Sequence, residues 1–210
     1  KLFEVYHFND SPVVGGIEEQ LCEMIYDRAP NYDLVIVTDF GHGMLTENAV
    51  SALTNRASFL AVNAQSNSAN LGYNLITKYE RADYICIDAP EAQLAMHNRF
   101  LDIGELIDSQ LRHSVECDHI IVTHGENGCV TWSPETGVHQ VPAFTSQVVD
   151  TVGAGDAFLS VTAPIVAAQT KIDVAGFIGN AVGALKVGIV GHRRSVEKIP
   201  VQKYITTLLK

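Results

Sequence analysis

The chain has 210 residues, 47% of them hydrophobic, so it can bury a substantial core as one domain. Its formal net charge is −10 and its only basic cluster is the pair Arg193-Arg194, which excludes nucleic acid and anionic membranes as expected partners. No apolar run approaches membrane-spanning length, no signal-peptide pattern opens the sequence, and the four cysteines form no C-x-x-C pair, so we expect a cytoplasmic protein with reduced thiols.

The first part of the chain alternates predicted helices with apolar strands. Apolar spacing predicts a helix over residues 16–28. Strands are predicted where β-branched runs end in a polar residue, at residues 34–38, 59–63 and 84–88. Further helices are predicted over residues 46–56, 90–97 and 103–115. This alternation favours a parallel sheet covered by helices on both faces.

The pattern changes after residue 118. Strands are predicted at residues 119–123 and 129–132, and Asn127-Gly128 between them indicates a hairpin. A second turn at residues 133–137 leads into a strand at 138–142, so the sheet is expected to gain antiparallel strands. Two helices should follow: one from Ala154 to about Ala168, kinked or shortened by Pro164, and one with Asp173 as its N-cap.

Several single residues receive a structural interpretation. Tyr32, Tyr84 and Trp132 are predicted to be core aromatics. His119, His124 and His139 have no metal-ligand spacing and are expected to pack or to face solvent. The segment from Asn63 to Asn74, rich in Asn and Ser, is expected to be a surface connection.

The run of residues 149–158 is the most informative stretch of the sequence. Gly153-Ala154-Gly155 lets the backbone bend where an apolar segment becomes a helix, and it leaves amide groups uncovered. Free amides at a helix start form an anion site. Asp156 follows directly and suits a general base, as phosphoryl transfer to a hydroxyl requires. The alternative is an ordinary glycine-rich loop with Asp156 as a first-turn capping acid.

Asp150-Thr151-Val152-Gly153-Ala154-Gly155-Asp156 resembles the D-T-x-G-A-G-D signature of the ribokinase-like (PfkB) carbohydrate kinases. The resemblance implies a three-layer α/β/α fold with a mostly parallel sheet. It also implies that Asp156 is the catalytic base and that the amides of Gly153, Ala154 and Gly155 form an anion hole for the transferred phosphoryl group.

Three further segments extend the resemblance across almost the whole chain. Residues 121–128 are similar to the family's T-x-G-x-x-G segment, which implies that Thr123, Gly125 and Gly128 lie beside the nucleotide. Asn180 lies on the last long helix, which the family packs near adenine. Residues 38–45 look like the D-Y-G-K-G segment of the heptose-phosphate kinase subgroup.

The sequence departs from the family in its charged groups. Asp88-Ala89-Pro90-Glu91 stands where the family has N-x-x-E, which organises phosphates and the Mg²⁺ hydration shell. The resemblance assigns Glu91 to Mg²⁺ and Asp88 to the nucleotide, although a second carboxylate near a triphosphate weakens binding unless a cation offsets it. Asp88 can also be the N-cap of the helix that Pro90 begins. His42 replaces the subgroup's lysine, and residues 64–68, which follow Asn63, contain none of the basic residues of the subgroup's D-P-K-like segment.

The resemblance also predicts what the chain lacks. Residues 1–6 resemble a segment that, in the family, follows the opening strands and the sugar-contacting lid. We therefore expect residues 1–210 to be the C-terminal portion of a kinase domain, inactive alone, with a missing N-terminal part or another chain completing the sheet.

Two functions follow from these patterns. The first is an ATP-dependent carbohydrate kinase that binds ATP or ADP, Mg²⁺ and a sugar or sugar phosphate, with heptose phosphate favoured. The second is a non-catalytic kinase-like module for nucleotide sensing or assembly, which the departures at Asp88, His42 and Asn63 favour.

Overall fold

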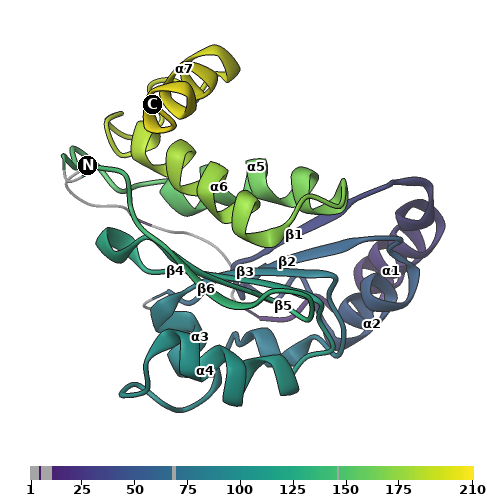
Figure 1. Ribbon diagram of the computed structural model, residues 1–210. Helices are drawn as coiled ribbons and strands as arrows, with labels where there is room; N and C mark the ends of the chain where they lie inside the picture. Colours follow the sequence, from purple (N-terminus) through teal and green to yellow (C-terminus); the bar gives the residue numbers. More distant parts are fainter. Residues whose placement is uncertain (1–4, 6–10, 68–69, 146) are drawn as a thin grey trace.

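A computed structural model describes residues 5, 11–67, 70–145 and 147–210 and contains one six-stranded sheet in the order β1-β2-β3-β4-β5-β6 (Figure 1). Strands β1 (Val35–Asp39), β2 (Leu60–Ala64), β3 (Tyr84–Asp88) and β4 (His119–Thr123) are parallel. Strands β5 (Cys129–Ser133) and β6 (Gly137–Val141) then add antiparallel. The predicted mostly parallel sheet with an antiparallel extension is confirmed.

Helices α1 (Gly16–Arg28), α2 (Glu47–Arg56), α3 (Ala89–Ala95) and α4 (Ile103–Ser109) lie on one side of the sheet. Apolar side chains of α2, α3 and α4 share a buried cluster with alternate residues of the strands, such as Ile85 and Val122. Helix α1 lies outside this layer against α2, where the Arg56 guanidinium stacks 4.1 Å from the centre of the Tyr26 ring.

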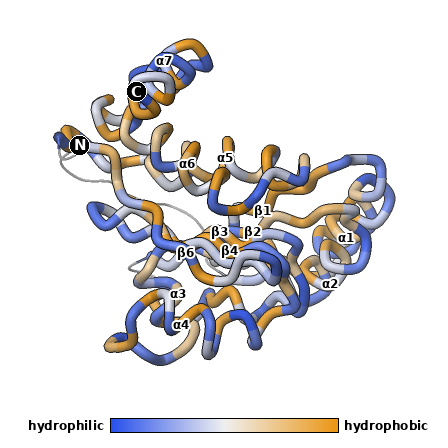
Figure 2. Tube along the Cα trace, in the orientation of Figure 1, coloured by the Kyte–Doolittle hydropathy of each residue, from blue (hydrophilic) through white to orange (hydrophobic). Residues whose placement is uncertain are grey.

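Helices α5 (Ala154–Ala167) and α6 (Ile172–Lys186) cover the opposite face and bury Ala61, Tyr84 and Ile121. The buried hydroxyls of Tyr84 and Thr162 hydrogen-bond at 2.8 Å, joining the centre of the sheet to α5. Helix α7 (Lys198–Leu208) packs on α6 beyond the three layers. Figure 2 shows long hydrophobic stretches along the central strands, as a sheet buried on both faces requires.

Short 3₁₀ turns join these elements: η1 (Ala29–Asn31), η2 (Ile76–Lys78), η3 (Leu111–His113) and η4 (Gly125–Asn127). The helix predicted over 103–115 is therefore interrupted, because α4 ends at Ser109 and η3 follows. Helix α5 continues through Pro164 to Ala167, so the proline does not end it.

Two residue-level predictions are wrong. Helix α6 begins at Ile172, because the carbonyl of Lys171 accepts its first hydrogen bond from Ala175, so Asp173 lies inside the first turn and is not the N-cap. Tyr32 is exposed because it lies in the short connection between η1 and β1, whereas Tyr84 and Trp132 are buried as predicted. Cys86, Cys117 and Cys129 are buried free thiols, and Cys22 is half-buried and free.

Candidate active site

Two adjoining cavities open at the carboxyl ends of the parallel strands, where ligand sites of open α/β sheets lie. The larger has a volume of about 860 Å³ and is lined by residues that follow β1 to β4 and by the start of α5. The smaller, of about 550 Å³, lies between the β4–β5 turn, the segment after β6 and helices α5 and α6. The two cavities share part of their walls, including Thr123, Thr151, Ala154 and Gly155. The start of α5 therefore lies at the boundary between them.

The loop before α5 presents unpaired amides to the larger cavity. Gly153 is the N-cap of α5 and adopts the left-handed φ of 75° that glycine tolerates best. Within the described part of the chain, no group accepts a hydrogen bond from the amides of Gly153, Gly155 or Asp156, whereas the amide of Ala154 donates to Thr151 O at 3.1 Å. Two of the three predicted anion-hole amides are therefore available, and the Asp156 amide joins them. Unpaired amides at the start of a helix, with the positive end of the dipole behind them, favour a negatively charged group.

Asp156 lies in the first turn of α5, is exposed, and lines the same cavity as these amides. The N-cap of α5 receives no hydrogen bond from a side chain, and no described group donates to the Asp156 carboxylate. Asp156 therefore occupies the first-turn position that both interpretations predict, and its side chain makes no capping hydrogen bond to a described residue. The carboxylate is available to accept a proton from a ligand.

Asp88 and Glu91 form a capping box at the start of α3, which confirms Asp88 as an N-cap. The Glu91 amide donates to Asp88 Oδ1 at 2.8 Å, and Glu91 accepts from the amides of Asp88 at 2.9 Å and Ser66 at 3.0 Å. Burial, with the nearby Asp88 charge, raises the pKa of Glu91 to about 7, and burial also raises the pKa of Asp88. Both line the larger cavity, so a cation there would favour their ionised forms.

The connection between β4 and β5 is a hairpin loop that contains the 3₁₀ turn η4 and is longer than the two-residue loop of a tight hairpin. The His124 amide donates to Gly128 O at 2.7 Å around η4. Gly128 has a φ of 84°, and a Cβ there would overlap Val141 O, so this glycine is required for packing. Gly125 has a φ of 53° but faces open space. Thr123 and Gly125 line both cavities, whereas Gly128 lines only the smaller one.

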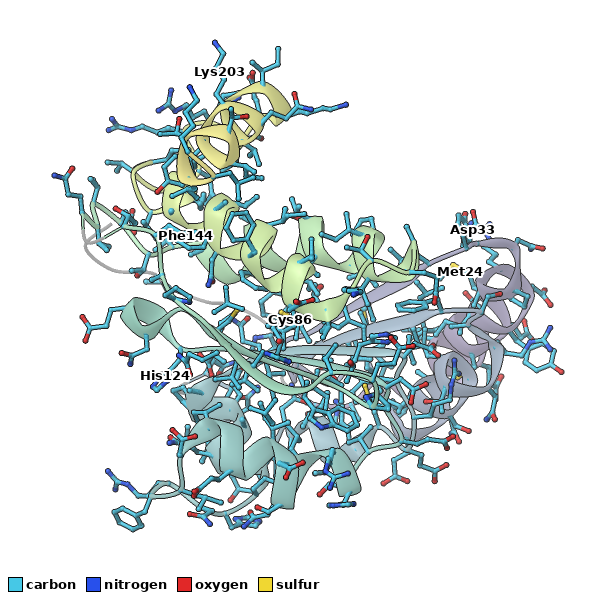
Figure 3. The ribbon with its side chains drawn as sticks, viewed as in Figure 1. Met24, Asp33, Cys86, His124, Phe144 and Lys203 are labelled. Atoms are coloured by element: carbon cyan, nitrogen blue, oxygen red, sulfur yellow. The ribbon has the colours of Figure 1, made fainter. Side chains whose placement is uncertain are left out.

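The smaller cavity is mainly apolar, with Phe144, Val148 and Phe158 among its walls. Asn180 also lines it, but its side-chain amide donates to Val141 O at 3.0 Å and to Pro142 O at 2.9 Å. Asn180 therefore fixes the segment after β6. Figure 3 shows Phe144 beside α6 and His124 at the β4–β5 turn. A slot of this shape and polarity suits a flat aromatic base.

The Asn-rich segment is more than the predicted surface connection, because Asn70 and Asn74 are buried. Asn70 donates to Phe40 O at 2.6 Å, and Asn74 donates to Asp39 O at 2.8 Å. These amides satisfy carbonyls where β1 ends, and they hold Phe40 in the wall of the larger cavity. Residues 68 and 69 lie outside the described residues, as do residues 1–4 and 6 of the opening segment.

The sequence patterns missed part of the cavity wall, including Phe40, Gln65, His124 and Thr151. The signal that could have found Gln65 and His124 is their position just after apolar strands. Asn63 lines the cavity, with its amide donating to Cys86 O at 2.8 Å, whereas His42 lines none of the cavities found in the described residues. No Lys or Arg lines the larger cavity in that part of the chain, as the predicted loss of cations implies.

The described residues show neither a cluster of metal ligands nor a membrane-spanning helix. They contain no group of three or more His, Cys, Asp or Glu side chains placed to hold a metal ion. None of their helices has the length and apolar character needed to cross a membrane.

Comparison with known proteins places these features in a family. Residues 32–199 match the profile of the pfkB family carbohydrate kinases. The chain is 25% identical over 183 residues to the bifunctional protein HldE of Citrifermentans bemidjiense and 28% identical over 185 residues to that of Nitrobacter winogradskyi. Each match covers 86% of this chain but 37% of the relative, so the chain spans little more than a third of these proteins.

Solved structures agree on the fold. Ribokinase from Thermotoga maritima superposes with a TM-score of 0.67 at 18% identity, over 86% of this chain and 59% of that one. Phosphofructokinase-2 from Escherichia coli, in complex with substrates and products, gives 0.73 at 15% identity, over 91% of this chain and 62% of that one. The expected ribokinase-like α/β fold is confirmed.

Proposed function

The chain belongs to the pfkB family of carbohydrate kinases, and from this premise we propose that it transfers the γ-phosphoryl group of ATP to a hydroxyl of a sugar or sugar phosphate. The nucleotide base would occupy the smaller, apolar cavity, and the phosphates and the sugar would share the larger one. Since the chain spans little more than a third of its curated relatives, we assign to it the nucleotide-binding and base-bearing part of the reaction.

One observation carries the proposal. Gly153 and Gly155, whose amides have no partner among the described residues, line the larger cavity together with Asp156, whose carboxylate accepts no hydrogen bond from a described group. Phosphoryl transfer needs donors for the charge on the transferred group and a base for the attacking hydroxyl, side by side.

The reaction then follows from these groups. Asp156 accepts the proton of the sugar hydroxyl while the oxygen of that hydroxyl forms a bond to the γ-phosphorus. The bond from the γ-phosphorus to the β–γ bridging oxygen breaks at the same time, and ADP is released. The amides at the start of α5 stabilise the charge on the transferred group. Buried carboxylates with raised pKa values suit a hydrated cation, so Glu91 and Asp88 are the residues that would hold Mg²⁺. Bound Mg²⁺ would neutralise phosphate charge.

The test is Asp156→Asn in the intact protein, with Asp33→Asn as a control at an exposed aspartate that does not line the cavities. Sugar phosphorylation should fall by about 10² or more, because the base is lost while the shape is kept. Mg-ADP affinity, measured by calorimetry, should survive. Turnover equal to that of the parent would contradict the assignment of the base.

The absence of Lys and Arg from the described walls of the larger cavity favours a second candidate, a kinase-like module that senses nucleotide without turnover. It predicts Mg-ADP binding but no phosphorylation of any sugar, with heptose phosphates the first to assay. Failure to bind Mg-ADP at millimolar concentration would count against both functions.

A further inference from the structure

A buried lysine lies behind the loop that precedes α5. Lys186 is the last residue of α6 and is 5% exposed. Its ammonium group donates to Val152 O at 2.6 Å and to Gly191 O at 2.9 Å, and no described carboxylate forms an ion pair with it. A buried charge is costly unless it is well bonded, so this arrangement calls for an explanation beyond packing.

Asp150 binds the same two residues from their other side. Its carboxylate accepts hydrogen bonds from the amides of Val152 at 3.0 Å and Gly191 at 2.7 Å. These two bonds, with the Lys186 charge, hold the pKa of Asp150 below its usual range. Val152 and Gly191 are therefore each held at N–H by Asp150 and at C=O by Lys186, and we call this arrangement the rear clamp.

The rear clamp sets the direction of one anion-hole amide. The carbonyl of Val152 and the amide of Gly153 belong to one peptide unit, which is planar and trans, so the two groups point in opposite directions. Because the carbonyl points to Lys186, the Gly153 amide points away from Lys186, and this amide has no partner among the described residues. Gly153 itself lines the larger cavity.

We propose that Lys186 is a positioning residue for phosphoryl transfer. Its ammonium fixes the Val152–Gly153 peptide so that the Gly153 amide is aimed at the transferred group, and it places a permanent positive charge behind a cavity whose described walls have no Lys or Arg. This inference rests on the proposed kinase function. A merely structural Lys186 would cap the C-terminus of α6, and its loss would lower stability alone.

The test compares Lys186→Met, which removes the charge at similar length, with Lys203→Met at an exposed position on α7 (Figure 3). In the intact protein, kcat should fall by about 10- to 100-fold in Lys186→Met, with KM for ATP changed much less, because the amide contact strengthens in the transition state. Amide hydrogen exchange over residues 150–157 should accelerate. Lys203→Met should leave both unchanged.

Chemical rescue separates charge from packing. Lys186→Ala leaves a space lined by the carbonyls of Val152 and Gly191, and added ethylammonium should restore part of kcat there, whereas ethanol should not. An unchanged kcat in Lys186→Met, or equal rescue by ethanol, would overturn the inference.

Hydrogen exchange keeps the inference testable apart from the proposed function. If the parent protein phosphorylates no sugar, the kinase function fails, and unchanged exchange over 150–157 in Lys186→Met would by itself overturn the rear clamp. If Lys186→Met does not fold, Asp150→Asn removes the charge from the other half of the clamp. It should accelerate the same exchange, and unchanged exchange would again overturn the inference.

Discussion

Two loops line the larger cavity, and each is fixed by a lysine and an aspartate used in opposite ways. At the end of β1 the buried member is Asp39, which pairs with the half-buried Lys78 and accepts from the Tyr79 hydroxyl at 2.8 Å. Before α5 the buried member is Lys186, which bonds only neutral carbonyls. The charge of Asp39 is neutralised where it lies, and its loop presents Phe40 to the cavity. The charge of Lys186 has no carboxylate in an ion pair with it among the described residues, and it lies behind the loop whose unpaired amides favour an anion.

The comparison predicts that substitutions in the loop after β1 mainly lower the free energy of unfolding, whereas substitutions around the loop before α5 mainly lower kcat. Asp39→Ala should lower the free energy of unfolding by about 3–5 kcal/mol, because it removes the acceptor of the buried Tyr79 hydroxyl and of the Gly41 amide and leaves the Lys78 ammonium, among the described residues, only its hydrogen bond to Asn74. Asp150→Ala should cost much less in stability and reduce kcat. Urea denaturation at pH 7 measures the first effect, and equal stability losses would break the comparison.

A glycine after β1 and a glycine in the β4–β5 turn give a second contrast. Gly41 has a φ of 70°, and a Cβ there would lie 2.6 Å from Asn74 Cβ, whereas the Cβ of an alanine at position 125 would face open space. Gly41→Ala should therefore cost about 3 kcal/mol or more, through strain and overpacking. Gly125→Ala should cost about 1 kcal/mol from its φ alone. Thermal unfolding with both variants checks the ranking, and a larger loss in Gly125→Ala would contradict it.

Glu91 lies between the two loops and adds a pH dependence. Burial raises its pKa in the folded protein to about 7, from an ordinary value near 4.5, so the folded state favours the protonated form. Its contribution to stability is complete below pH 4.5 and is lost as the pH rises through 7, a change of about 2–3 kcal/mol. The stability difference between the parent and Glu91→Gln should fall over that window, and a flat difference would contradict the burial of an ionisable carboxyl.

The smallest effect at the Asp39 cluster belongs to Tyr79, whose pKa is raised by burial and by Asp39. Tyr79→Phe removes one hydrogen bond to Asp39, which keeps Lys78 and the Gly41 amide at 3.0 Å, so we expect a loss of about 1.5 kcal/mol. Denaturant titration of the parent and the variant tests this value. A loss as large as that of Asp39→Ala would show that the tyrosine, and not the lysine, neutralises the carboxylate.

The sheet and the loop before α5 could be predicted because their signals are local. Strands β1 to β4 are short apolar runs with a polar residue at the last position or, in β2, the one before it, and the Gly153–Asp156 run is contiguous. The groups that fix the site could not be predicted, because their partners are distant in sequence. Asn74 bonds a carbonyl 35 residues away and Lys186 one 34 residues away. The spacing of apolar residues does not indicate whether the side chain of a lysine at the end of a helix, such as Lys186, is buried or exposed.

The bond between Tyr84 and Thr162 spans 78 residues, and it has a consequence for synthesis on the ribosome. At 5–20 residues per second, β3 is complete roughly 4 to 15 seconds before the middle of α5 has been made. During that interval the side of the sheet that carries Tyr84, Cys86 and Ile121 has no helical cover. The loop before α5 arrives with the same helix that ends this exposure. A nascent chain therefore completes this part of the cavity wall only together with the helix that covers the apolar face of its sheet.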